Sequence, residues 1–171
     1  IVGHAWLWLP ALLALLMMLP RILSAQFGLM DDGVIAMNAE NYKGVLFLTD
    51  FDLAGRFRPV YWQYYSGLYR LIGANPLIFY LLHAAMFTAI VALVILLVRR
   101  LGGNRMQAFI AGIVALSAGP VIENFYTLSK GEPLQTFLVL AGLLVIQSLA
   151  GSKTKWGRVL IFCASALMFV L

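Results

Sequence analysis

Charged side chains are scarce in this sequence: Asp, Glu, Lys and Arg make up 11% of its 171 residues, whereas soluble domains carry about 25%. Hydrophobic residues make up 63%, and the mean hydropathy is +0.92. A soluble core of this size cannot bury so much apolar surface, so the composition excludes an ordinary soluble domain. We therefore predict an all-α, polytopic transmembrane helix bundle.

Cysteine and several catalytic motifs are also lacking. Cys163 is the only cysteine in the sequence, so no disulfide forms within it and the redox compartment stays open. The sequence has no Gly-rich phosphate loop, no Cys or His cluster and no Ser nucleophile elbow. His4 and His83 lie in separate apolar runs, which favours packing or helix-to-helix hydrogen bonding over a metal site.

What the sequence has instead is a series of long apolar runs. A span needs about 20 predominantly apolar residues, with a range of about 17 to 25. The runs cover about residues 1–20, 77–98, 106–122, 133–150 and 159–171, of which the third is short and the last is cut off. Because the sequence starts at Ile1 rather than at a methionine, we expect a single transmembrane module of a longer protein.

The first run has an alternative interpretation as a signal peptide. The stretch ILSAQ, residues 22–26, offers small residues like those of a cleavage site. The run is longer than a usual signal-peptide core, which favours a membrane span.

Acidic residues are confined to two segments of the chain, whereas two short loops are purely basic, and this pattern predicts orientation. The loops at residues 99–105 (RRLGGNR) and 151–158 (GSKTKWGR) each carry three basic residues and no acid, which predicts a cytoplasmic location. Residues 21–76 and 123–132 then lie outside, and they hold all seven acids. We predict that acids from these two loops form one extracytoplasmic site. The net charge of +5 comes mainly from basic residues at the ends of apolar runs, which membrane orientation explains, so no nucleic-acid partner is expected. The expected partners besides substrates are membrane lipids.

The first extracytoplasmic loop, residues 21–76, is too long for an idle connection. Apolar and aromatic residues recur at three- and four-residue spacing from Val60 to Ile72, which predicts an amphipathic helix at the membrane interface. A second short juxtamembrane helix is expected from Asp31 to Tyr42, with an acid in its first turn.

Three carboxylates are candidates for chemistry. Asp31 and Asp32 are adjacent, so on a helix at most one of them faces a substrate directly. Glu132 precedes Pro133, which suits the first turn of a helix. All three also have a purely structural interpretation, because acids at helix starts compensate the helix dipole.

Three basic residues on the same predicted side are candidates for binding a lipid phosphate. Arg56 and Arg58, in GRFRP, are separated by one residue, and arginine binds phosphate oxygens in a bidentate manner. Lys130 lies beside Glu132 in the second loop. The alternative is that these residues anchor the chain to lipid headgroups.

These motifs together resemble the N-terminal module of the membrane-embedded C-type glycosyltransferases (the GT-C superfamily), such as protein mannosyltransferases and aminoarabinose transferases. MDDGVIAMNAENY, residues 30–42, is similar to the family's acidic pair at the start of the first outer loop. YTLSKGEPLQTFLVLAGLL, residues 126–144, is similar to its second acidic loop, and GRFRPVYW, residues 55–62, to its Arg-rich turn.

The resemblance implies a glycosyltransferase that takes its sugar from a polyprenyl-phosphate-type lipid carrier. The acceptor, a protein, lipid or glycan, would arrive from the extracytoplasmic side. Asp31 or Asp32 would act as the general base, with a slight preference for Asp32, and Glu132 would orient the acceptor. Arg56, Arg58 or Lys130 would stabilise the leaving phosphate. No metal or other cofactor is assigned, and a divalent ion stays open.

Two other functions remain open. A transporter places charged residues within its spans, whereas no Asp, Glu, Lys or Arg falls inside the four complete runs. A non-catalytic membrane scaffold is compatible with the structural interpretation of Asp31, Asp32 and Glu132. We expect a multi-pass integral membrane protein, in the plasma (inner) membrane if its source is bacterial.

Overall fold

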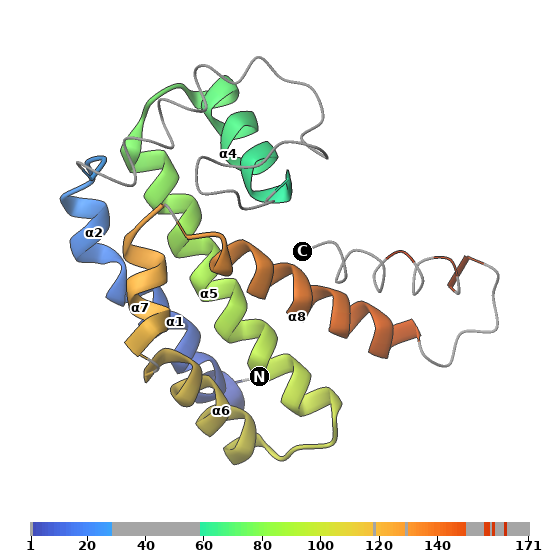
Figure 1. Ribbon diagram of the computed structural model, residues 1–171. Coiled ribbons are helices and arrows are strands. Elements are labelled where there is room, and N and C mark those ends of the chain that lie inside the picture. Colours follow the sequence, from blue (N-terminus) through green and yellow to red (C-terminus); the bar gives the residue numbers. More distant parts are fainter. Residues whose placement is uncertain are drawn as a thin grey trace.

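The computed structural model describes residues 2–28, 59–117, 119–128 and 130–149, together with residues 156, 157, 159 and 163. Within these ranges the chain is helical and contains no strand (Figure 1). The all-α prediction is therefore confirmed for the described residues. Three helical stretches are long and apolar enough to cross a membrane, namely Ala5–Leu23, Pro76–Arg100 and Glu132–Leu149. They overlap the runs at residues 1–20, 77–98 and 133–150.

The first of these stretches is interrupted. It comprises a 3-10 helix, η1 (Val2–Trp8), and two α-helices, α1 (Leu9–Met17) and α2 (Leu19–Leu23). Proline lacks a backbone N–H and suits the first turn of a helix, and Pro10 and Pro20 stand in the first turns of α1 and α2. Met18, which is fully buried, joins the two helices in a turn.

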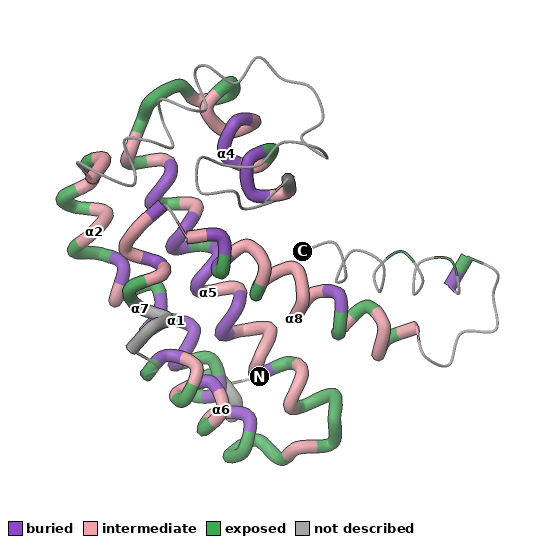
Figure 2. Tube along the Cα trace, viewed as in Figure 1, coloured by how far each residue is buried: buried purple, intermediate pink, exposed green. Residues whose placement is uncertain are grey.

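The longest helix, α5 (Pro76–Arg100), forms the centre of the bundle. It packs against α1, against α6 (Arg105–Ser117) and against α8 (Glu132–Leu149), as Figure 1 shows. Residues between Tyr80 and Ile95 on α5 are buried at successive turns and form the core of the bundle. Figure 2 shows these buried positions in purple along α5. Gly112 of α6 lies so close to α1 and α5 that an added Cβ would meet Pro10 Cβ at 3.0 Å and Ile95 at 3.1 Å.

The turn between α5 and α6 is fixed by local hydrogen bonds. The Asn104 side chain accepts from the Gln107 backbone N–H at 2.9 Å, and the Gln107 side chain accepts from the Asn104 N–H at 2.8 Å. This reciprocal pair is a capping box, which satisfies two amides at the start of α6. Arg99 donates to the Gly103 carbonyl at 2.8 Å. The turn thus sets α6 antiparallel to α5 and gathers Arg99, Arg100 and Arg105 at one end, here named the arginine end.

The predicted third span, residues 106–122, is divided between two helices. α6 ends at Ser117, and α7 (Gly119–Tyr126) follows after residue 118. Each is shorter than a membrane span, although α6 is apolar. Glu123 near the end of α7, Lys130 in the connection and Glu132 at the start of α8 lie at one end of the bundle. We name this end of the bundle the acidic end.

The helix expected at the end of residues 21–76 is present as α4 (Pro59–Ile72). Its aromatic face packs on protein, across the start of α5 at the acidic end (Figures 1 and 2). The residues of this cluster are Tyr61, Trp62, Tyr65, Phe79, Tyr80 and Leu128. The expected helix from Asp31 to Tyr42 and the cut-off run at residues 159–171 lie outside the described residues, apart from Val159 and Cys163.

Candidate functional site

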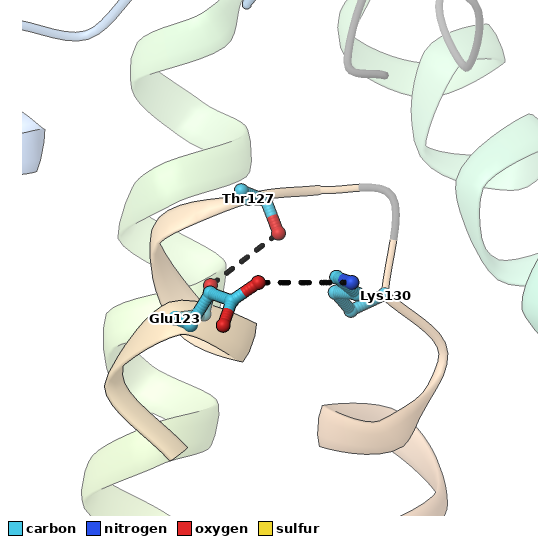
Figure 3. Close-up of polar contacts among 3 residues, drawn as sticks. All are labelled: Glu123, Thr127 and Lys130. Atoms are coloured by element: carbon cyan, nitrogen blue, oxygen red, sulfur yellow. Dashed lines mark hydrogen bonds and ion pairs between the residues drawn. The ribbon is translucent and has the colours of Figure 1, made fainter. Parts of the chain in front are cut away.

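The chain between α7 and α8 forms a hairpin that brings Lys130 back beside Glu123. Lys130 Nζ lies 3.9 Å from Glu123 Oε1 across the hairpin, and the Thr127 hydroxyl donates to the Glu123 backbone carbonyl at 3.4 Å (Figure 3). The side chains of Lys130 and Glu123 are 37% and 71% exposed, so this ion pair is close to the surface. An exposed pair of this kind contributes about 0–1 kcal/mol and is easily given up.

Contacts place the top of the hairpin at the level of Arg21, since Tyr126 accepts from Arg21 and Leu128 packs with Tyr80. The start of α8 lies deeper, because Glu132 lines a cavity with Ile90 and Val94 of α5. Arg21 contacts Tyr80 of α5, whereas Phe125, just before the hairpin, stacks on Phe87 with ring centroids 4.4 Å apart. Seven residues of helix separate Tyr80 from Phe87, a rise of about 10 Å. Figure 1 likewise shows α8 leaving α5 some distance from the α4 end. The start of α8 is therefore recessed from the level of Arg21.

This recess matters because α5 has the length of the apolar layer. From Tyr80 to Arg100 the helix rises about 30 Å, which matches the hydrocarbon thickness of a bilayer. Arg21 and Arg100 would then mark its two faces, and Glu132 would start below one of them. Ionisable groups at such a depth usually have a function. Glu132 is the first residue of the apolar helix Glu132–Leu149, one residue before the run at residues 133–150.

A cavity of about 240 Å³ opens beside the hairpin, between α5, α6, α7 and α8. Three of its lining residues are polar, namely Asn124, Glu132 and Thr136. The others are apolar: Ile90, Val94, Ala115, Phe125, Pro133 and Leu140. Among the described residues, the side chains of Asn124, Glu132 and Thr136 have no hydrogen bond or ion pair. They are available to a ligand.

The roof of this region is α4, which two buried tyrosines attach to the bundle. The Tyr61 hydroxyl donates to the Leu128 carbonyl at 3.1 Å, and the Tyr61 ring lies 3.5 Å from the position of a Cβ on Gly131. The Tyr65 hydroxyl lies 2.6 Å from His83 Nε2. Both contacts fix α4 over the hairpin that carries Glu132.

His83 links three helices through its two ring nitrogens. It is 1% exposed, and its Nδ1 lies 3.4 Å from the Phe125 carbonyl of α7. A carbonyl only accepts, so Nδ1 carries the proton, and Nε2 accepts from Tyr65 of α4. The expectation of helix-to-helix hydrogen bonding is confirmed for His83. Among the described residues no group of three His, Cys, Asp or Glu side chains could hold a metal ion.

Arg21 ties α2 to α5 and α7 and was given no role in the sequence analysis. Its Nε donates to the Tyr126 carbonyl at 3.1 Å, its NH2 donates to the Gln26 carbonyl at 3.1 Å and to the Tyr80 hydroxyl, and its guanidinium lies 4.2 Å over the Tyr80 ring. The Tyr126 hydroxyl in turn donates to the Met17 carbonyl at 2.5 Å. The available signal was a lone arginine at the end of an apolar run.

The sequence-predicted site residues fall into two groups. Glu132 lines the cavity and Lys130 pairs with Glu123 without lining it. Asp31, Asp32, Arg56 and Arg58 lie outside the described residues.

On α4, burial raises the pKa of Tyr64 to about 12, so this phenol stays neutral at ordinary pH.

Comparison with known proteins finds no relation: no family model, no curated protein and no solved structure matches this chain.

Proposed function

We propose that this chain is the membrane-embedded module of a glycosyltransferase that moves a sugar from a polyprenyl-phosphate-type carrier to an acceptor at the acidic end. The observation that carries the proposal is the recessed cavity with Glu132 at its rim. The described chain leaves this end of the bundle at Gly28 and returns to it at Pro59. Phe27 contacts Phe79 at the start of α5, and Tyr61 contacts Leu128.

The segment between Gly28 and Pro59 carries the acids and arginines that the chemistry needs. In the proposed step, Asp31 or Asp32 takes the proton of an acceptor hydroxyl. The hydroxyl oxygen of the acceptor then forms a bond to the anomeric carbon of the sugar. The bond from that carbon to the phosphate oxygen breaks, and the electron pair leaves with the lipid phosphate. Arg56 and Arg58 would stabilise the leaving phosphate, since guanidinium groups bind its oxygens in pairs.

Glu132 and Lys130 have supporting parts in this scheme. Glu132 is exposed at the cavity rim, where its carboxylate can accept a hydrogen bond from the acceptor. Lys130 is held by a weak, half-exposed ion pair with Glu123, so it can turn to a phosphate at little cost. The roof formed by α4 would limit access of water to the reacting groups.

The test is a transfer assay with membranes that contain the full-length protein and a panel of radiolabelled polyprenyl-phosphate sugars. We expect Asp31→Asn or Asp32→Asn to lower transfer by about 10² to 10⁴, the contribution of a positioned base. Asp50→Asn and Asp52→Asn are matched controls, because these acids lie in the same loop and have no proposed role. Full transfer by both the Asp31 and Asp32 variants would overturn the proposal.

A second function, an ion-coupled transporter, is favoured by the place of Glu132 on the cavity beside Ile90 and Val94 of α5. Reconstitution in liposomes separates the two functions. A glycosyltransferase retains bound polyprenyl phosphate after purification and shows no proton or sodium flux. A flux that Glu132→Gln abolishes would favour the transporter.

A further inference from the structure

The cavity beside Glu132 changes from polar to apolar along its length. On α8, Glu132, Thr136 and Leu140 line it at four-residue spacing, so they lie one above another on the same helix face. Opposite them, Ile90 and Val94 of α5 line it at the same spacing. The cavity therefore presents a carboxylate, then a hydroxyl, then only hydrocarbon.

The charge of the cavity selects the kind of head group. Among the described residues that line it, Glu132 is the only charged one, and Lys130 does not line it. A phosphate at this rim would face a carboxylate, and like charges repel each other. An ammonium or hydroxyl group would instead donate to Glu132, to the Asn124 oxygen and to the Thr136 hydroxyl.

The size of the cavity limits the apolar part of the ligand. Sites for drug-sized molecules measure about 300–1,000 Å³. A cavity of about 240 Å³ accommodates one short stretch of a single hydrocarbon chain. It is too small for a lipid carrier together with its sugar.

We infer that this cavity binds a single-chain amphiphile whose head group donates hydrogen bonds and carries no phosphate. This assignment rests on the proposed function in one respect: it makes the cavity the acceptor site and leaves the donor phosphate to Arg56 and Arg58. The acceptor would be a hydroxyl- or amine-bearing chain that enters from the membrane side of α5 and α8.

The experiment uses the full-length protein in phosphatidylcholine nanodiscs and three photoactivatable probes with the same chain: dodecylamine, dodecanol and dodecyl phosphate, each carrying a diazirine near the chain end. Cross-linked peptides are mapped by mass spectrometry. We expect the amine and the alcohol to label α5 or α8 at the cavity, and the phosphate to label it at least about tenfold less, the factor for a charged hydrogen bond.

Three variants make the result specific. Glu132→Gln keeps the shape of the rim and should lower labelling by the amine about tenfold while bringing the phosphate closer to the alcohol. Ala115→Leu should block all three probes, because it fills the apolar part. Glu123→Gln in a Lys130→Gln background is the matched control. It removes a carboxylate of the same hairpin outside the cavity without freeing Lys130, and it should leave the order of the probes unchanged.

Equal labelling by phosphate and amine, the same effect from Glu123→Gln as from Glu132→Gln, or no labelling at the cavity in folded protein would each overturn the inference. The outcome is distinguishable from that of the proposed function. Loss of transfer without any change in probe order leaves the cavity assignment standing, and intact transfer with an unlabelled cavity overturns the cavity assignment alone.

Discussion

At the scale of single residues, two polar side chains within the apolar bundle have partners on other helices. His83 connects α5 to α4 and α7, and Arg21 connects α2 to α5 and α7. A buried polar group without such a partner costs about 1–3 kcal/mol. These two residues therefore specify which helices lie together as well as contributing stability.

The bond between Tyr65 and His83 can be measured by a double-mutant cycle. We expect Tyr65→Phe and His83→Leu each to destabilise the protein by about 1–3 kcal/mol, because each leaves a buried partner unsatisfied. The double variant should be less destabilised than the sum, by about 0.5–3 kcal/mol. Thermal unfolding in detergent, followed by size-exclusion chromatography of the soluble fraction, provides the measurement. Additive effects would show that the two groups do not interact.

At the scale of helices, the aromatic residues of α4 and Gly112 of α6 determine how these two helices pack on the bundle. The aromatic face of α4 was expected at the lipid interface, but Tyr61, Trp62 and Tyr65 are buried against the bundle. Spacing predicts that a face is apolar and does not say whether lipid or protein covers it. At the other end, α1, α5 and α6 approach each other at Gly112.

Two glycine substitutions separate packing from helix propensity. Gly112→Ala should lower stability by about 1 kcal/mol, since the strain against Pro10 and Ile95, about 1–3 kcal/mol, exceeds the gain of about 1 kcal/mol from better helix formation. Gly67→Ala on α4 should raise stability by up to about 1 kcal/mol, because nothing lies within 4 Å of the added Cβ. The midpoint of thermal aggregation distinguishes the two. A stabilised Gly112→Ala protein would contradict the close packing.

At the scale of the whole molecule, the described acids lie toward one end of the bundle only. Arg99, Arg100 and Arg105 gather at one end, and Glu123 and Glu132 lie toward the other. α8 remains the least covered of the long helices, with 6% of its apolar window buried against 39% for α5. Its exposed apolar side chains, such as Leu143 and Val145, suit contact with lipid or with further helices.

The orientation of the bundle follows from this asymmetry and can be tested by labelling. In a Cys163→Ser background, we expect Leu71→Cys at the acidic end to react with a membrane-impermeant maleimide in intact cells. Leu101→Cys at the arginine end should react only after permeabilisation, since basic loops stay in the cytoplasm. Both side chains are largely exposed, at 82% and 71%, so access is comparable. Labelling of Leu101→Cys in intact cells would reverse the predicted orientation.

The sequence by itself determined the helical class, the positions of the long apolar helices, the helix at residues 59–72 and the confinement of the acids to two segments. These features follow from local periodicity and from the cost of placing charge in hydrocarbon, and both can be read from the sequence. Tertiary structure decided four features: the division of the third run between α6 and α7, the burial of the α4 aromatics, the hydrogen bonds of Arg21 and His83 to other helices, and the depth of Glu132. Each depends on contacts between residues far apart in sequence, such as Phe125 on Phe87, and no local pattern encodes the level at which two helices meet.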